Sequence, residues 1–413
     1  MTHAPSSYAP LFRAAGRSYF PIAFVARLPF AMMIVGVLTL VVAERDSVTL
    51  GGLNSAVAGI GTALAGPLLG AAVDRFGQRR VLLPVGLVNA ALLGAFPLVV
   101  ASSAADAVLL ALSVAIGASA PQIAPMSRTR LMAIIRRSIG EDRREKTLGG
   151  TMAYESAADE MVFIIGPFLV GLLATAIAPW VAVAGAAVLT LVFVTAFALH
   201  PSGRVQPGTD RTAETPAPVR ELLGLPLLTV VVGTLGVGIF FGATLTSLTG
   251  FLADDGNGDR AGLLYGVMGI GSAVLALGTA ALPERFTLRA RWAAFGSLLL
   301  AAAIGYACAR SEAGLVAALA VLGCGVGPTL VTLYSLAAQL SPAGRSATTM
   351  TMLGSAVVVG QALASAVTGA VAEGQGADAA LAAPAVAAAL VVAAALAHTA
   401  SSPRRAEREL VSA

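Results

Sequence analysis

The sequence is dominated by long, unbroken apolar runs that are separated by short polar loops. The first run covers 19–43. Eleven more follow, at 50–73, 81–101, 105–126, 148–177, 180–199, 223–252, 261–282, 292–309, 313–338, 346–371 and 379–399. About 20 apolar residues suffice for a helix to cross the hydrocarbon core of a bilayer. The runs are continuous rather than alternating, and only helices or closed barrels satisfy their own backbone in lipid. The sequence therefore predicts an all-α membrane protein with twelve transmembrane helices.

The composition excludes several classes of protein. Residues are 57% hydrophobic and only 12% charged, whereas a soluble protein carries about 25% charge. The single lysine, Lys146, follows Glu145 and no glycine-rich loop, so a phosphate-binding P-loop is excluded. Cys308 and Cys324 have no C-x-x-C spacing, and the histidines fall near segment ends or in tails. We therefore expect no enzyme activity, no cofactor or metal, and no nucleotide or nucleic acid partner.

One polar linker divides the chain into two sets of six apolar runs. Pro, Thr, Gly and scattered charge in this stretch are typical of a flexible connection. The sequence predicts an N-terminal six-helix half at 1–200, a cytoplasmic linker at 201–222, a C-terminal six-helix half at 223–400 and a cytoplasmic tail at 401–413. The two halves are expected to be pseudo-symmetric, and the chain to act as a monomer.

The positions of the basic residues predict the orientation in the membrane. If the N-terminus is cytoplasmic, nearly all Arg residues and Lys146 fall in cytoplasmic loops, including the basic stretch 128–146. Only Arg45, Arg260 and Arg310 fall in the outer loops. Because cytoplasmic loops are enriched in Lys and Arg, both termini are expected to be cytoplasmic, in the plasma membrane.

A charged, glycine-punctuated loop joins the second and third apolar runs. Its pattern is G-x3-D-R-x-G-x-R-R, formed by Gly70, Asp74, Arg75, Gly77, Arg79 and Arg80. Gly70 lets two helices approach closely, Gly77 permits a tight turn, and Asp74 is suited to accept hydrogen bonds from a helix N-terminus. A basic loop that only sets the orientation is the alternative interpretation.

This pattern resembles the signature loop of the major facilitator superfamily of secondary transporters. The resemblance implies the twelve-helix fold of that family, and a loop that latches the two halves in one state and releases them in the other. Residues 283–289, between the eighth and ninth runs, resemble a second copy that keeps an acid and arginines but has lost the glycines.

The fifth apolar run contains three acids, Glu155, Asp159 and Glu160. Glu155 and Asp159 share one helix face, and Glu160 points about 100° away. Acids in a bilayer are costly unless they are paired or protonated, so they are functional candidates. Arg27 lies at a similar depth in the first run. We hypothesise that Arg27 pairs with one acid while another carries a transported proton; a static ion pair is the alternative.

Gly166-Pro167 in the same run resembles the Gly-Pro motif of facilitator antiporters, although an ordinary proline kink is the alternative. The fourth run departs from the antiporter pattern, because Ser113 stands where drug:proton antiporters commonly have an arginine. The proton relay of those families therefore cannot be copied onto this chain.

A few polar and aromatic residues are candidates for lining a substrate cavity. Contacts between helices are the commoner role for the polar ones, and packing is an equally open interpretation for the aromatic ones. They are Asn54, Asn89, Gln122, Gln361, Phe240, Phe241 and Tyr334. A cavity with so little charge would suit a largely apolar solute.

The sequence thus predicts a secondary transporter of a small organic solute that works by alternating access. The pattern resembles bacterial drug-efflux permeases, which implies export of drug-like or lipophilic compounds in exchange for protons. The alternatives are a proton-coupled importer of a nutrient or metabolite, and a membrane receptor or lipid-handling protein on the same scaffold.

Overall fold

The computed structural model describes residues 9–204, 217–254, 261–283 and 285–401, and within these ranges all regular structure is helical. Among the described residues, twelve segments are long and apolar enough to cross a membrane, as the sequence predicts. The tail after residue 401 and most of the linker lie outside the described residues. The predicted half and linker boundaries remain predictions.

The first six spans make up the N-terminal half. They are α2 (Tyr19–Val25) with α3 (Leu28–Arg45), α4 (Val48–Phe76), α5 (Gln78–Val100), α6 (Asp106–Ala118) with α7 (Ile123–Ser138), α8 (Glu141–Ala176), and α9 (Pro179–Leu189) with the π-helical η1 (Thr190–Val194) and α10 (Thr195–Leu199). A short helix, α1 (Ala9–Ala15), precedes them, and the 3₁₀ turn η2 (Pro201–Arg204) follows.

The other six spans make up the C-terminal half. They are α11 (Leu225–Asp254), α12 (Ala261–Gly278) with the 3₁₀ turn η5 (Thr279–Ala281), α13 (Leu288–Ala307), α14 (Glu312–Leu340), α15 (Ser346–Gln375), and α16 (Ala377–Ala380) with α17 (Ala383–Ser401). The 3₁₀ turn η3 (Val219–Leu223) precedes them.

The fourth and fifth spans differ most from the predicted runs. The fourth was expected to end at 126, but it breaks at Pro121 and resumes as α7. The prediction that Arg128 and Arg130 lie in a loop is therefore wrong: both are in α7 and only 1% exposed. Arg128 pairs with Asp159 of α8, and Arg130 donates hydrogen bonds to Gln78 of α5 and to the Phe197 carbonyl of α10, which offsets part of the cost of their burial. The fifth span begins at Glu141, seven residues before the predicted start.

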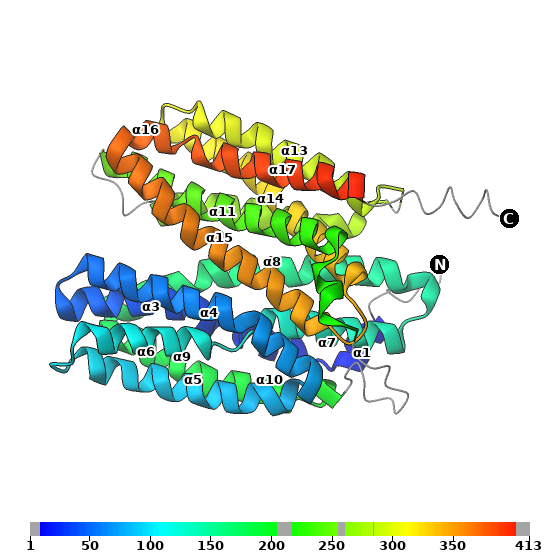
Figure 1. The fold of residues 1–413 in the computed structure, drawn as a ribbon, viewed down its shortest axis with the longest axis horizontal. Helices are drawn as coiled ribbons and strands as arrows, with labels where there is room; N and C mark the ends of the chain where they lie inside the picture. Colours follow the sequence, from blue (N-terminus) through cyan, green and yellow to red (C-terminus); the bar gives the residue numbers. More distant parts are fainter. Residues whose placement is uncertain (1–8, 205–216, 255–260, 284, 402–413) are drawn as a thin grey trace.

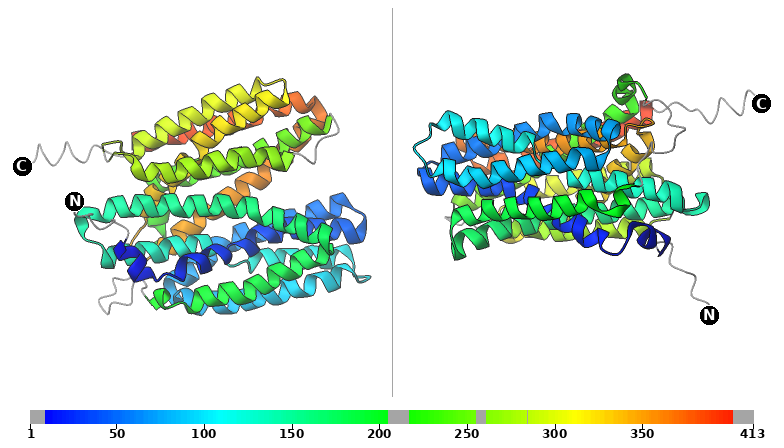
Figure 2. Two further views of the ribbon diagram at one scale, coloured as in Figure 1. Left: turned by 180° about the vertical axis from the view of Figure 1, so that it is seen from behind. Right: turned by 90° about the horizontal axis from the view of Figure 1, so that it is seen from below.

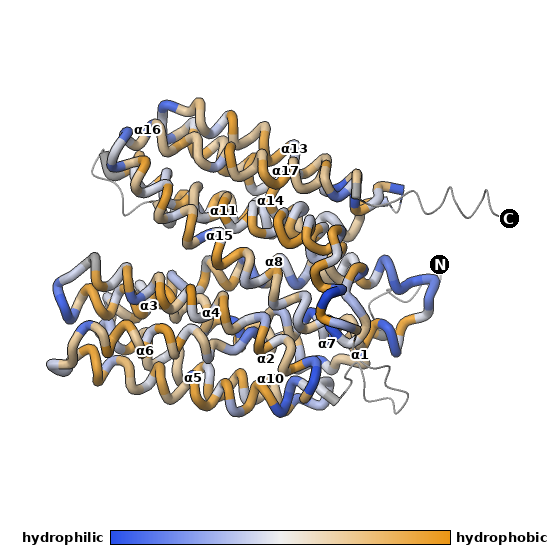
Figure 3. Tube along the Cα trace, in the orientation of Figure 1, coloured by the Kyte–Doolittle hydropathy of each residue, from blue (hydrophilic) through white to orange (hydrophobic). Residues whose placement is uncertain are grey.

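The two halves form two groups of roughly parallel helices (Figure 1). α15 crosses from the C-terminal group to the N-terminal group, where it packs on α4 near the signature loop. Viewed from behind, α8 runs along the boundary between the groups (Figure 2). Hydrophobic residues dominate the middle of the helices, and hydrophilic residues gather at their ends (Figure 3).

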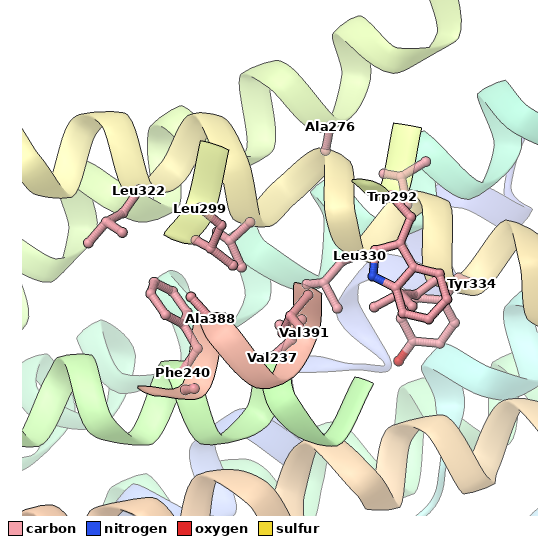
Figure 4. Close-up of a cluster of buried hydrophobic side chains, with 14 of the residues drawn as sticks. Val237, Phe240, Ala276, Trp292, Leu299, Leu322, Leu330, Tyr334, Ala388 and Val391 are labelled. Atoms are coloured by element: carbon pink, nitrogen blue, oxygen red, sulfur yellow. The ribbon is translucent and has the colours of Figure 1, made fainter. Parts of the chain in front are cut away.

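Each half has its own apolar packing. The C-terminal half is centred on large buried side chains such as Phe240, Trp292 and Leu299 (Figure 4). In the N-terminal half, one cluster surrounds α3 and another joins α1 and α2 to α7 and α10. Small residues set the closest helix contacts, as is usual in membranes. At the contact between α4 and α6, a Cβ added at Gly117 would lie only 1.8 Å from the carbonyl oxygen of Ala58.

We predict that Gly117→Ala lowers the thermal stability of the purified protein in detergent. The added methyl group meets backbone rather than a movable side chain, so the cost should be about 1–3 kcal/mol. Gly94→Ala in α5 is the matched control, because no atom lies within 4 Å of the added Cβ. Its effect should stay within about 1 kcal/mol, in the stabilising direction. Equal melting temperatures for both variants would contradict this packing.

Candidate functional site

A cluster of two arginines and two acids lies within the N-terminal half. Arg27, at the break between α2 and α3, places Nη2 2.5 Å from Oε2 of Glu155 and Nε 3.4 Å from Oδ1 of Asp159. Arg128 of α7 places Nη2 2.7 Å from Oδ2 of Asp159. Both acids project from α8, one turn apart. The structure thus brings together three of the four predicted proton-coupling residues, and adds Arg128.

The cluster is buried and its formal charges cancel. Arg27, Arg128 and Glu155 are at most 3% exposed, whereas Asp159 is 19% exposed. Removing one partner from a buried ion pair typically costs about 3–5 kcal/mol, because an uncompensated charge remains. Asp159 is the member that solvent reaches, and it is shared by two guanidinium groups. A change in its charge would therefore unbalance both arginines.

Two hydroxyl groups extend the cluster and fix Glu155. Ser127 Oγ donates to Glu155 Oε1 over 2.9 Å, and the hydroxyl of Tyr19 lies 2.7 Å from Ser127 Oγ. With Arg27 on its other oxygen, Glu155 has a partner on each carboxylate oxygen. Sequence reasoning missed both residues. The adjacency of Ser127 to Arg128 carried the only signal, and it was hidden by the assignment of this stretch to a loop.

The cluster also touches the C-terminal half. The guanidinium of Arg128 lies 3.8 Å from the ring centroid of Tyr334, a cation–π contact with α14. Tyr334 is 7% exposed and belongs to the C-terminal core. Tyr334, a candidate for lining the substrate cavity, therefore joins the charged cluster to the other half through this cation–π contact.

Glu160 has different surroundings from the other two acids. It points away from them, as the helical period predicts, and its Oε1 accepts a hydrogen bond of 2.9 Å from Ser272 Oγ of α12. The side chain is 8% exposed. Within the described residues no basic group forms an ion pair with it. Glu160 is thus a buried acid on the boundary between the halves, held by one hydroxyl group.

The signature loop joins the two halves through Asp74. This carboxylate, at the end of α4, accepts hydrogen bonds from the backbone N–H groups of Ala347 (2.9 Å) and Thr348 (2.8 Å), and from the Thr348 hydroxyl (2.6 Å). These N–H groups lie in the first turn of α15, where they have no partner within their own helix. Asp74 therefore caps α15 from the other half. The release of this contact in another state of the transporter remains a prediction.

The glycines of the loop have the expected roles. A Cβ at Gly70 would lie 2.2 Å from Thr351 Oγ1 and 2.8 Å from the Ala347 carbonyl oxygen, so α4 and α15 are in close contact there. Gly77 has φ +88° between α4 and α5, a conformation that side chains with a Cβ rarely adopt. The three arginines of the loop are exposed: Arg75, Arg79 and Arg80.

Gln78 stands at an undefined position of the motif, and its side chain also forms hydrogen bonds. Its Nε2 donates to the Met126 carbonyl and Thr129 Oγ1, and its Oε1 accepts from Arg130 at 2.7 and 2.9 Å. The guanidinium of Arg130 also lies 3.9 Å from the centroid of the Phe197 ring. Sequence reasoning missed Gln78, because it stands at a position that the motif leaves undefined.

His200 lies near this second polar group. It hydrogen bonds to Ser18 and Ser202, and Ser202 lies within 3.4 Å of Arg130. Partial burial and the positive charge of Arg130 lower the pKa of His200 below its ordinary value. The ring is therefore neutral at neutral pH, and it fastens the segment before α2 to the end of α10.

Gly166 and Pro167 lie inside α8, which continues to Ala176. A Cβ at Gly166 would lie 2.6 Å from the Cβ of Ala31, so α3 and α8 approach closely here. This contact keeps α3, which follows Arg27, against the helix that carries the acids. The role of the pair as an antiporter motif remains a prediction.

Most of the other cavity candidates make contacts within one half. Asn54 accepts from Ser113 Oγ over 2.7 Å, and Asn89 donates to the Ile116 carbonyl. Phe240 is fully buried in the C-terminal core, where it stacks with Phe241. The backbone of Gln361 packs on Gly242, whereas Gln122, 8% exposed, lies near Gly354 of the opposite half. Their substrate contacts remain predictions.

The family of the chain is shown by comparison with known proteins. Residues 19–311 match the family model described as Major Facilitator Superfamily. The chain belongs to the Major Facilitator Superfamily. No curated protein sequence matches it. The family match covers the first signature loop and its second copy, so the resemblance that those motifs implied is confirmed at the level of the superfamily.

Solved structures share the fold over nearly the whole chain. The human organic anion transporter MFSD10 (TETRAN) is 19% identical with a TM-score of 0.69, covering 96% of this chain and 100% of its own. The fucose:proton symporter FucP of E. coli is 15% identical with a TM-score of 0.63, covering 92% and 99%. A bacterial homologue of the iron transporter ferroportin, in an outward-facing state, is 15% identical with a TM-score of 0.69, covering 97% and 100%.

We predict that Asp74→Asn weakens the contact between the halves more than Thr348→Val does. The first change removes the negative charge that favours a helix N-terminus, while the second removes one of three hydrogen bonds and leaves both backbone donors in place. Spin-label distances across the contact of α4 with α15 should report a larger separated population in the Asn variant. Similar distance distributions in the two variants would contradict a charge-dependent latch.

Proposed function

We propose that this facilitator transporter couples the movement of a small organic solute to protons, exporting drug-like or lipophilic compounds in exchange for them. Its superfamily makes it a membrane transporter. The observation that carries the proton coupling is Glu160, a buried acid on the boundary between α8 and α12 that has a hydroxyl partner but no ion pair within the described residues.

Glu160 is suited to load and release a proton. An acid within a membrane span is costly when charged and unpaired, so its charge state strongly affects which arrangement of its surroundings is favoured. Its partner Ser272 belongs to the other half. Protonation would remove the charge while the carboxyl group could still hydrogen bond to Ser272, so a proton at this site favours contact between α8 and α12. Loss of the proton favours access to water.

Asp159 is the second candidate for carrying the proton, and its protonation would have a different effect from that of Glu160. It is shared by Arg27 and Arg128, and Arg128 stacks on Tyr334 of the other half. A proton on Asp159 would leave a net positive charge on the cluster and free Arg128. Glu155 is less suited to this role, because Arg27 and Ser127 occupy both of its oxygens.

The polar residues of the spans support a largely apolar solute. Asn54 and Asn89 are engaged by neighbouring helices rather than pointing free donors at a ligand. Recognition of a sugar or phosphate needs several such free donors and acceptors. The fucose:proton symporter and the organic anion transporter share the fold with this chain at low identity. These two neighbours show that the fold is compatible with proton coupling and with various solutes.

We predict that Glu160→Gln abolishes transport driven by a pH gradient in proteoliposomes. Gln preserves the size of the side chain and an acceptor for Ser272, but it cannot release a proton. Solute exchange without a pH gradient should persist. Glu373→Gln, an exposed acid near the end of α15, is the control and should leave flux unchanged.

Asp159→Asn tests the second candidate proton carrier in the same assay. It also removes the charge partner of Arg128, so we expect a loss of stability of about 3–5 kcal/mol in addition to lost coupling. Unchanged proton-driven flux in both the Glu160 and Asp159 variants would refute the coupling proposal.

Export is tested in a host that lacks its own drug pumps, with and without this chain. We expect raised tolerance to several lipophilic compounds, and loss of that tolerance when a protonophore removes the gradient. Increased accumulation of a nutrient or metabolite would instead favour proton-coupled import. A receptor or lipid-handling protein would produce neither result.

A further inference from the structure

The end of the linker has a sequence that restricts its conformation. It reads Pro216-Ala217-Pro218, and the structure describes it from Ala217 onward. A residue that precedes proline is confined to extended conformations, and proline itself has no N–H group. Ala217 therefore carries the one N–H group of this tripeptide, on an extended stretch of chain that is suited to pair with a neighbouring loop.

Both main-chain groups of Ala217 bind the turn that precedes α15. Its N–H donates to the Ala343 carbonyl over 3.0 Å, and its carbonyl accepts from Nε of Arg345 over 2.9 Å. The turn is closed by the N–H of Arg345, which donates to the Pro342 carbonyl, and it contains Gly344 at φ +68°. Ala217, Ala343 and Arg345 thus form a clip, the linker clip, that fastens the end of the linker to the C-terminal half.

Arg345 stands where its charge is unfavourable for its own helix. It directly precedes the first turn of α15, which begins at Ser346. A helix N-terminus carries a partial positive charge, which disfavours a cation beside it. The Ala217 carbonyl and the Asp74 carboxylate offset that cost, because Arg345 donates to the first and attracts the second. The Arg345 side chain is thus held by one group from the linker and one from the other half.

The start of the linker is held by the N-terminal half. Ser202 Oγ lies 3.4 Å from Nη1 of Arg130, and a Cβ added at Gly203 would lie 3.2 Å from Nη2 of the same guanidinium. Arg130 also donates to Gln78, four residues after Asp74 in the signature loop. The described ends of the linker are therefore attached to the two partners of one contact, the signature loop and the start of α15.

We propose that the linker clip positions the start of α15 for its contact with Asp74. The clip fixes residues 343 and 345, and Asp74 binds the N–H groups of residues 347 and 348 directly after them. A turn that is already ordered presents those N–H groups in the orientation that the carboxylate accepts, so the joining of the halves costs less conformational entropy. The linker thus contributes to the contact between the halves as well as connecting them covalently.

This coupling acts in both directions. If the linker clip strengthens the Asp74 contact by some factor, the Asp74 contact must strengthen the clip by the same factor. The role is independent of the cargo and of proton coupling, because it concerns only the joining of the halves.

Ala217→Pro in the full chain tests the positioning role. It removes the N–H group that binds Ala343, but it keeps an extended backbone and changes no charge. Spin-label distances across the contact of α4 with α15 should show the ratio of separated to joined molecules raised about two- to fivefold, the factor that corresponds to one hydrogen bond. Ala217→Ser, which keeps the N–H group, is the matched control and should leave the ratio unchanged.

Two further measurements separate positioning from a general loss of stability. In the Asp74→Asn background, Ala217→Pro should change the ratio little further, because the contact that the clip serves is already weakened. Hydrogen exchange at the Ala217 amide should be faster in Asp74→Asn than in the unmodified chain. The amide of Gly314, which donates to Ser311 Oγ at the other end of α14, is the control and should exchange at the same rate in both.

Equal ratios for Ala217→Pro and Ala217→Ser would overturn the proposal. An undiminished effect of Ala217→Pro in the Asp74→Asn background would also overturn it, because the clip would then act somewhere other than on the Asp74 contact. Exchange at Ala217 that does not respond to Asp74→Asn would refute the reciprocal coupling between the clip and that contact.

Discussion

The cost of an uncompensated charge inside a membrane governs the arrangement of this transporter. Arg27 and Arg128 are balanced by Glu155 and Asp159, and the four side chains come from three spans. A buried carboxylate without a nearby guanidinium would leave an uncompensated charge. The break between α2 and α3 and the continuation of the fourth span as α7 bring those guanidinium groups to α8. The positions of the helix breaks therefore determine which charges are compensated.

Much of the fold could be predicted, because lipid imposes a strict rule on length and polarity. The twelve spans, the suitability of Asp74 for capping a helix and the pairing of Arg27 with an acid all follow from local patterns and from depth in the membrane. The length of the fourth span could not be predicted in this way, because residues 123–138 are too polar to be recognised as part of a membrane segment. Burial of Arg128 and Arg130 depends on partners such as Asp159 and Gln78, which are distant in sequence.

The polar contacts between the halves are of three different chemical types. Asp74 joins them through backbone hydrogen bonds, Arg128 through the ring of Tyr334, and Glu160 through a hydroxyl of Ser272. The described residues of the duplicated loop face the interior of α8 rather than a helix start. A pattern of residues could indicate the duplication, but the point at which α8 begins had to be seen in three dimensions.

The source of the hydrogen bonds to Asp74 has a consequence for how the sequence of this contact can evolve. Two of the three hydrogen bonds to Asp74 come from the main chain of residues 347 and 348, which nearly every amino acid supplies. Side chains at the start of α15 are thus free to diverge between relatives, provided that they leave room for the close approach at Gly70. We therefore expect selection to act mainly on the Asp74 carboxylate and on Gly70. This explains how a short motif on α4 can stay recognisable when the surface it binds has no motif of its own.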